Sequence, residues 1–289
     1  MDFDTFIAKS WDDHATDAPA VAQRLGEGVP LVTDEAQLVR LSVLAHHVHG
    51  GHLADWRGGI AFIEGLAALP VHVREGTSGM ALRRHLASLS LAGGSAAALD
   101  GLSASDRIRV CGLAAANLAD HDALRAGQLL RDAADAAQRS ALPASDPMNR
   151  DLAVAGNSLA CALEEKATRS SDERDLMILA AQTARHYWAI AGTWLETERA
   201  EYRLSNTWRH AGDLMRAREH AQACLAIVAD NDGPALERLF GWEALGLVER
   251  AAGNDTRHAE ALAHARQAFA ELDDSDKEWC AASVEKLAA

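Results

Sequence analysis

Small and large side chains recur at fixed offsets along this chain, and that pattern constrains the fold more than any other feature. After Leu204 the small residues stand at Ser205, Gly212, Ala217, Ala221 and Cys224, with the large Trp208 between them. Further copies of the pattern, some with short insertions or with looser spacing, begin at Leu44, Leu86, Leu113, Ala155 and Leu245. A pattern that repeats in this way predicts repeated structural units.

The offsets are those of two helices joined by a turn. The small residue after the leading leucine, and the one after the turn, let the two helices approach each other closely. A glycine near the turn, such as Gly212 or Gly253, ends the first helix in a left-handed conformation. One such helical hairpin cannot bury its apolar face alone, so several are expected to stack.

The pattern resembles the tetratricopeptide repeat family. The segments that carry the resemblance are YRLSNTWRHAGDLMRAREHAQACL at 202–225 and WEALGLVERAAG at 242–253. The repeat starts from Ala155 onward are 41 to 49 residues apart, against about 34 in the family. The chain is therefore identified as a divergent, bacterial-type member with lengthened helices and turns.

The resemblance implies an all-α fold, a right-handed superhelical array of helical hairpins (an α-solenoid). We expect one domain over 1–289, with its clearest repeats at 36–69, 104–139, 196–230 and 234–272 and a capping helix at 275–288. Helix starts are predicted at Pro147, which follows Asp146, and at Pro234, which follows Gly233. Capping boxes are predicted at Ser170-x-x-Glu173 and Ser275-x-x-Glu278.

Composition narrows the functional classes. A formal net charge of −14 argues against general binding to nucleic acid or to anionic membranes. There is no apolar run long enough to span a bilayer, and the N-terminus is acidic. The four cysteines are widely spaced and are expected to be reduced core residues. Together these features predict a bacterial-type cytoplasmic protein, without predicting its oligomeric state.

In the family that the chain resembles, the first helix of each hairpin lines a concave groove that recognises partners. Placing the offsets on this sequence predicts groove residues Asn157, Tyr202, Asn206, Arg209, His210, Glu243 and Arg250. An asparagine amide can pair with a passing peptide backbone. A clustered set of arginines favours an acidic segment or a chain terminus as the ligand, and these are Arg199, Arg203, Arg209 and Arg250. In the alternative, the asparagines satisfy local groups and the arginines pair with Glu196, Glu198 and Glu201.

The segment HHVHGGH at 46–52 offers a weaker, metal-binding interpretation. His46, His49 and His52 follow one another at helical spacing, and imidazoles so placed can bind zinc or nickel. No cysteine or carboxylate completes a set nearby, apart from Asp55, so a polar helix face is the competing interpretation and no metal site is assigned. Motifs for dinucleotide binding, phosphate loops, serine hydrolases and zinc proteases are missing, so neither catalytic residues nor a cofactor are predicted.

The sequence thus predicts a scaffold or adaptor that binds a protein or peptide in its groove. The alternative is a regulatory protein that senses a small molecule or a short peptide. A metal-dependent enzyme built on the 46–52 segment is a third interpretation.

Overall fold

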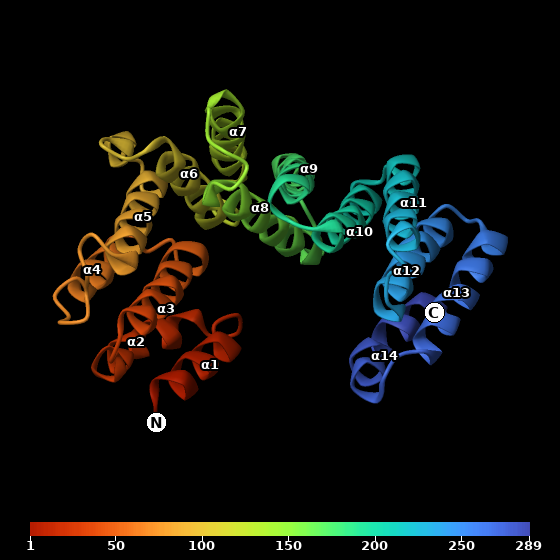
Figure 1. Cartoon of the computed structure of the whole chain (residues 1–289), viewed down its shortest axis with the longest axis horizontal. Coiled ribbons are helices and arrows are strands. Elements are labelled where there is room, and N and C mark those ends of the chain that lie inside the picture. Colours follow the sequence, from red (N-terminus) through yellow and green to blue (C-terminus); the bar gives the residue numbers. More distant parts are fainter. The chain divides into compact units, whose positions relative to one another are not determined.

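The structure is a computed structural model that describes residues 1–289 and consists of α-helices joined by short turns, without β-strands (Figure 1). The prediction of an all-α fold is confirmed. Sequence analysis treats the chain as one domain, whereas its contacts divide it into two compact units, Met1–Pro143 and Ala144–Ala289. None of the helices combines the length and apolarity that crossing a membrane requires.

The first unit, which we call unit 1, holds seven α-helices and three shorter turns of helix. The α-helices are α1 (Phe3–Asp13), α2 (Ala18–Gly28), α3 (Glu35–His46), α4 (Trp56–Leu66), α5 (Thr77–Ala92), α6 (Ala104–Leu118) and α7 (Ala123–Arg139). The shorter elements are the 3-10 turns η1 (Val29–Leu31) and η3 (Ala96–Leu99) and the π-helical turn η2 (His47–His52).

The apolar core of unit 1 joins its first five helices. Phe6, Leu25, Leu41 and Ile63 are fully buried in it, one from each of α1 to α4, and Leu89 of α5 joins them. The range 36–69, in which a repeat is expected, holds α3 and α4 with η2 between them. The truncated copy at Leu86 supplies only α5, which packs against both α3 and α4.

The second unit, unit 2, consists of seven α-helices. They are α8 (Pro147–Glu165), α9 (Ser171–Ala191), α10 (Trp194–Ala211), α11 (Leu214–Asp230), α12 (Ala235–Ala251), α13 (Asp255–Ala270) and α14 (Asp274–Ala288). Neighbours in sequence pack as pairs, α8 on α9, α10 on α11 and α12 on α13. These pairs occupy the ranges in which hairpins are predicted.

Small residues permit the close packing of these pairs. A Cβ added to Gly156 of α8 would lie 2.5 Å from the carbonyl oxygen of Ala180 on α9, closer than real contacts allow. Between α10 and α11, Gly212 has φ of +86° and ends the first helix in the left-handed conformation. Both features are predicted from the repeat offsets.

Helix starts follow the predicted caps with one exception. Ser170 and Glu173 form a complete capping box at the start of α9, and Pro147 opens α8 behind the N-cap Asp146. Pro234 is itself the N-cap residue of α12. The box predicted at Ser275 is wrong, because Asp273 caps α14 and the Ser275 hydroxyl donates to Asp273 instead.

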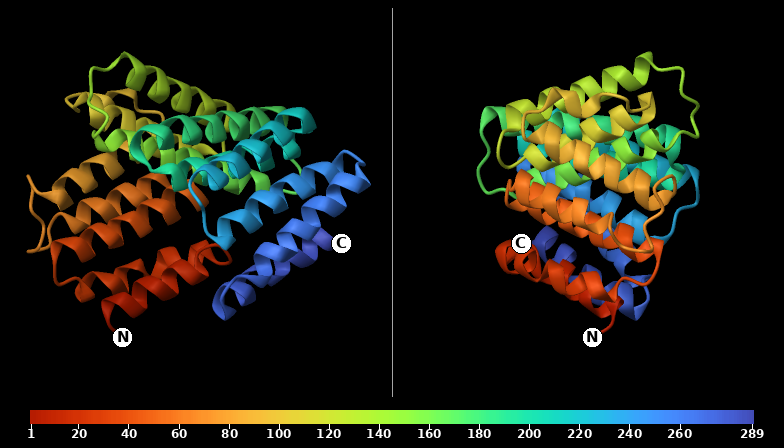
Figure 2. Two further views of the ribbon diagram at one scale, coloured as in Figure 1. Left: turned by 45° about the vertical axis from the view of Figure 1, so that its right-hand side comes forward. Right: turned by 90° about the vertical axis from the view of Figure 1, so that its left-hand side faces the viewer.

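The last helix covers the last pair. Leu287 of α14 is fully buried and reaches Gly246 of α12, and Cys280 joins it in a core with Leu239 and Leu247. Figure 2 shows α12, α13 and α14 alongside one another in blue. Trp279 of α14 is 67% exposed, and its ring contacts that of Phe240.

Candidate functional site

Helix α10 buries more polar side chains than a helix in an apolar core normally does. The buried polar residues of α10 are Glu198, Glu201, Ser205, Asn206 and Thr207. A buried carboxylate is costly unless it is paired. Glu201 accordingly pairs with Arg185 at 2.5 Å and with His220 at 2.6 Å. Other polar side chains of α10 face α8 and α12. Together with their partners on those two helices they form a polar group, and most of the predicted groove residues belong to it.

Toward α8, the group is centred on the carboxylate of Glu164. Its two oxygens accept from Thr207 Oγ1 and from Arg203 Nη1, each at 2.5 Å. Burial raises the pKa of Glu164, and the adjacent Arg203 opposes that rise. The carboxylate neutralises Arg203, so this guanidinium has little charge left to offer to a partner.

Toward α12, Tyr202, Asn206 and Glu243 lie together as the offsets predict. The Tyr202 hydroxyl donates to Glu243 at 3.0 Å, and burial raises the pKa of both groups. The Asn206 amide donates to the Tyr202 carbonyl oxygen at 3.3 Å and accepts from Arg209 Nη2 at 3.1 Å. The side chain of Asn206 therefore orients Arg209.

Arg209 is the cation of this group that has no carboxylate partner. Its guanidinium donates to Asn206 and approaches His210, forms no ion pair, and has a buried Nε without a hydrogen-bond partner. Burial lowers the pKa of Arg209, although an arginine keeps its proton at neutral pH. A charged donor that is held in place without a carboxylate ion pair is able to bind an anion.

His210 lies among several cations. Burial, followed by the charges of Arg209, Arg169 and Lys286, lowers the pKa of His210 to about 4. The imidazole is therefore neutral at pH 7. The charge of Arg250 also lowers the pKa of Arg209. We call Arg169, Arg203, Arg209, Arg250 and Lys286 the basic cluster.

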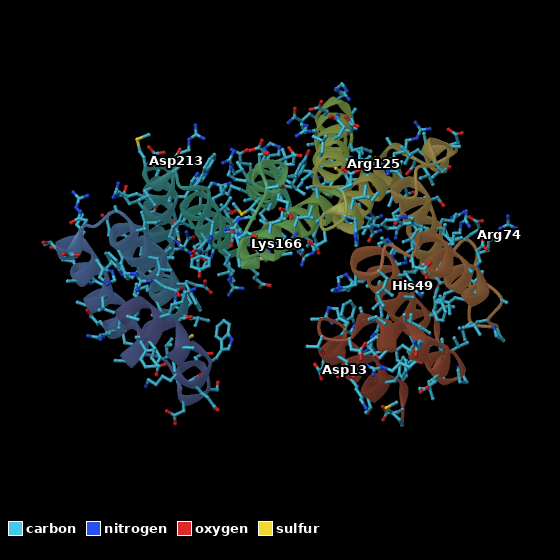
Figure 3. All side chains as sticks on the ribbon, turned by 180° about the vertical axis from the view of Figure 1, so that it is seen from behind. Asp13, His49, Arg74, Arg125, Lys166 and Asp213 are labelled. Atoms are coloured by element: carbon cyan, nitrogen blue, oxygen red, sulfur yellow. The ribbon has the colours of Figure 1, made fainter.

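Two members of the basic cluster have structural partners. Arg169 donates to the carbonyl oxygens of Leu163, Glu164 and Lys166 at the end of α8. Arg250, a predicted groove residue, donates to the carbonyl oxygens of Lys286 and Leu287 at the end of α14. Cations stabilise helix C-termini in this way. Figure 3 labels Lys166, which marks the end of α8.

Lys286 completes the set of available cations. It is exposed on α14 and donates no hydrogen bond within the protein, and its charge acts on both His210 and Glu243. Arg209 from α10 and Lys286 from α14 therefore remain for an external anion. Lys286 and Arg169 are not among the predicted groove residues, because neither falls on a repeat offset.

Asn157 lies on α8 and contacts a group on its own helix. It is half-buried, and its amide lies 3.8 Å from the sulfur of Cys161 one turn later. Asn206 likewise donates to the Tyr202 carbonyl oxygen one turn earlier on α10. Both asparagines therefore bond to local groups, as the alternative interpretation predicts.

Arg199 and Arg203 do not form ion pairs with Glu196, Glu198 or Glu201, the partners that the alternative interpretation predicts. Arg199 pairs with Glu237 of α12 at 2.5 Å, and Arg203 pairs with Glu164. Glu196 instead closes the capping box of α10 with Thr193. These partners come from neighbouring helices, so the ion pairs connect helices rather than bracing a single one.

In unit 1, the three candidate histidines do not share one site. His46 is buried, its Nε2 lies 3.0 Å from the Asn117 amide nitrogen and 2.6 Å from Ser88 Oγ, and its ring stacks on His85. His49 lies 3.1 Å from a carboxylate oxygen of Asp55. His52 points instead toward His47 and His14.

Comparison with models of known protein families and with curated protein sequences finds no match to this chain.

Proposed function

We propose that this protein is a binding scaffold of the tetratricopeptide-repeat type, whose second unit holds an acidic segment or a chain terminus of a partner protein. The observation that carries the proposal is Arg209. Its guanidinium is held by Asn206, has no carboxylate partner and lies beside His210, whose pKa the charge of Lys286 also lowers. Two cations from different helices suit a carboxylate, which can accept from both.

The surrounding groups support specificity for an extended peptide. Asn157 is half-buried on α8 and carries a donor and an acceptor, so it can pair with a peptide backbone whatever its side chains are, while the buried Asn206 orients Arg209. Their helices, α10 and α8, pack on each other and meet at Glu164. A peptide end bound at Arg209 would therefore have further polar partners along its length. The neutral His210 adds an imidazole beside the cations.

The chain's overall charge makes this site selective. The protein carries a formal net charge of −14, so most of its surface repels an acidic ligand. A local group of cations then fixes where such a ligand can bind. Binding is expected to weaken with added salt, because the exposed Lys286 is screened.

The experiment is affinity capture with the purified full-length chain, followed by mapping of the bound segment by crosslinking. The proposal predicts one stoichiometric protein partner whose crosslinked segment is acidic or C-terminal. The variant Arg209→Ala/Lys286→Ala should lose this partner. Arg266→Ala, which removes an exposed arginine of α13, should retain it. Capture that is equal with both variants contradicts the proposal.

A further inference from the structure

The π-helical turn η2 brings together two imidazoles that a regular helix would separate. In an α-helix, residues five apart point about 140° away from each other. In η2 the N–H of Leu53 donates to the carbonyl oxygen of Val48, five residues earlier, at 3.2 Å. As a result the Nε2 atoms of His47 and His52 lie 3.1 Å apart. Such turns are rare and occur frequently at functional sites.

The neighbouring helices hold η2 in this conformation. His46, just before it, is fixed by Ser88 of α5 and Asn117 of α6. Gly50 lies so close to Asn117 that an added Cβ would be 2.6 Å from its Oδ1. His121 donates from Nε2 to the carbonyl oxygen of Gly51 at 3.2 Å. The two imidazoles are thus presented by a supported turn, as a metal site requires.

A third imidazole comes from the end of α1. The ring of His14 lies 5.0 Å from that of His47 and 5.1 Å from that of His52, measured between centroids. The Nδ1 of His14 bonds to the carbonyl oxygen of Trp11. Since a carbonyl only accepts, Nδ1 carries the proton and Nε2 has the free lone pair. Metal-binding histidines are oriented in this way. Figure 3 labels Asp13 and His49, neighbours of these residues in sequence.

We propose that His14, His47 and His52 bind one divalent transition-metal ion, with Zn²⁺ as the ion that fits best. Three imidazoles with a fourth position open to water are a common zinc coordination. Imidazole nitrogens suit zinc, nickel and copper rather than magnesium or calcium. The proposal concerns unit 1 alone and does not depend on the basic cluster.

The three imidazoles need only a small movement of His14 to reach the spacing of a zinc site. One ligand atom from each of the three side chains lies within 4.8 Å of the others. Zn–N bonds of about 2.0–2.1 Å in a tetrahedron place the nitrogens about 3.3 Å apart. The His47–His52 pair already has this separation. His14 is the C-cap residue of α1, so rotation of its side chain can close the remaining distance.

The electrostatic surroundings favour a cation. The carbonyl end of α1 carries partial negative charge next to His14, and the carboxylate of Asp120 acts on His52. His52 is the most exposed of the three, so an ion can reach it from solvent.

The test is titration of the metal-free full-length protein with zinc chloride, followed by calorimetry and by elemental analysis after desalting. One zinc per chain is expected. His52→Gln should weaken binding by at least about 100-fold, since losing a ligand costs more than losing a supporting partner. His186→Gln, at an exposed histidine of unit 2, should bind like the unmodified protein.

A second measurement counts the histidines that zinc affects in the unmodified chain, and this count does not depend on how a variant folds. Zinc should shift the imidazole nitrogen resonances of three histidines in ¹⁵N spectra, and His14→Gln and His52→Gln should identify two of them. Absence of zinc binding, unchanged stoichiometry in both variants, or shifts confined to other histidines would overturn the proposal. In the last two cases zinc binds elsewhere, and the three rings serve only to pack α1 against η2.

Discussion

Arg209 and Asn206, one turn apart on α10, are joined by a hydrogen bond of 3.1 Å from the guanidinium Nη2 to the amide Oδ1. The bond links the two side chains most important for the proposed function. Asn206 is buried and fixed by the Tyr202 carbonyl oxygen, so it restricts where the guanidinium can point. A neutral acceptor orients the cation without neutralising it.

Replacing this neutral acceptor by a charged one should block binding. In Asn206→Asp, the new carboxylate pairs with Arg209 and occupies it. A charge-assisted hydrogen bond contributes about 1.5–3 kcal/mol, so the affinity for an acidic partner should fall by about 10- to 100-fold. Surface plasmon resonance with the captured partner measures this. Asn231→Asp, which adds the same charge at the exposed end of α11, is the matched control. Equal loss in both variants would point to net charge instead.

The close approach of α8 and α9 should make Gly156 sensitive to one added methyl group. In Gly156→Ala the new Cβ meets the Ala180 carbonyl oxygen at 2.5 Å and the Ala184 nitrogen at 2.9 Å. Overpacking of this kind costs about 1–3 kcal/mol. Urea unfolding followed by circular dichroism should show that loss.

Gly65 of α4 provides the matched control for Gly156. Nothing lies within 4 Å of a Cβ added there, so Gly65→Ala should instead gain up to about 1 kcal/mol from helix propensity. If both variants were stabilised, α8 and α9 would be packed more loosely than described.

Glu198 should make the protein less stable as the pH rises. Burial raises the pKa of Glu198 to about 8, and the neighbouring carboxylate of Glu237 adds to the rise. In the unfolded chain a glutamate has a pKa of about 4.3. Between these values the folded protein holds one more proton than the unfolded chain, so the free energy of unfolding falls with pH. The limiting slope is about 1.4 kcal/mol per pH unit.

The variant Glu198→Gln isolates this contribution. Its stability relative to the unmodified protein should be greater at pH 8 than at pH 5, as measured by urea unfolding at several pH values. Glu260→Gln, at an exposed position of α13, should show no such trend. Parallel pH profiles for Glu198→Gln and the unmodified protein would mean that Glu198 is ionised throughout.

Local signals account for the parts of the structure that could be predicted. Gly212, Pro147 and Ser170 mark helix ends because their backbone or capping preferences act over a few residues. Tyr202, Asn206 and Arg209 could be placed together because spacings of four and three residues lie on one face of a helix. The all-α fold and most helix positions follow from such patterns.

The features that could not be predicted from the sequence depend on packing between distant segments. Arg169 and Lys286 reach His210 only because of how α8, α10 and α14 pack, and no periodicity in the sequence relates them. His14 meets His47 because α1 lies beside η2, and a π turn replaces the regular helix on which the spacing of His46, His49 and His52 depends. The division into two units also depends on long-range contacts.

Titration of a single peptide measures whether Arg209 and Lys286 bind a carboxylate of the partner, as we propose. A fluorescent peptide carrying the crosslinked segment is titrated with the full-length protein and followed by anisotropy. The unmodified chain should bind it with an affinity that falls with salt, and Arg209→Ala should weaken binding at least tenfold, while Arg266→Ala should not. Equal affinity of the unmodified chain and Arg209→Ala for the peptide would contradict the account.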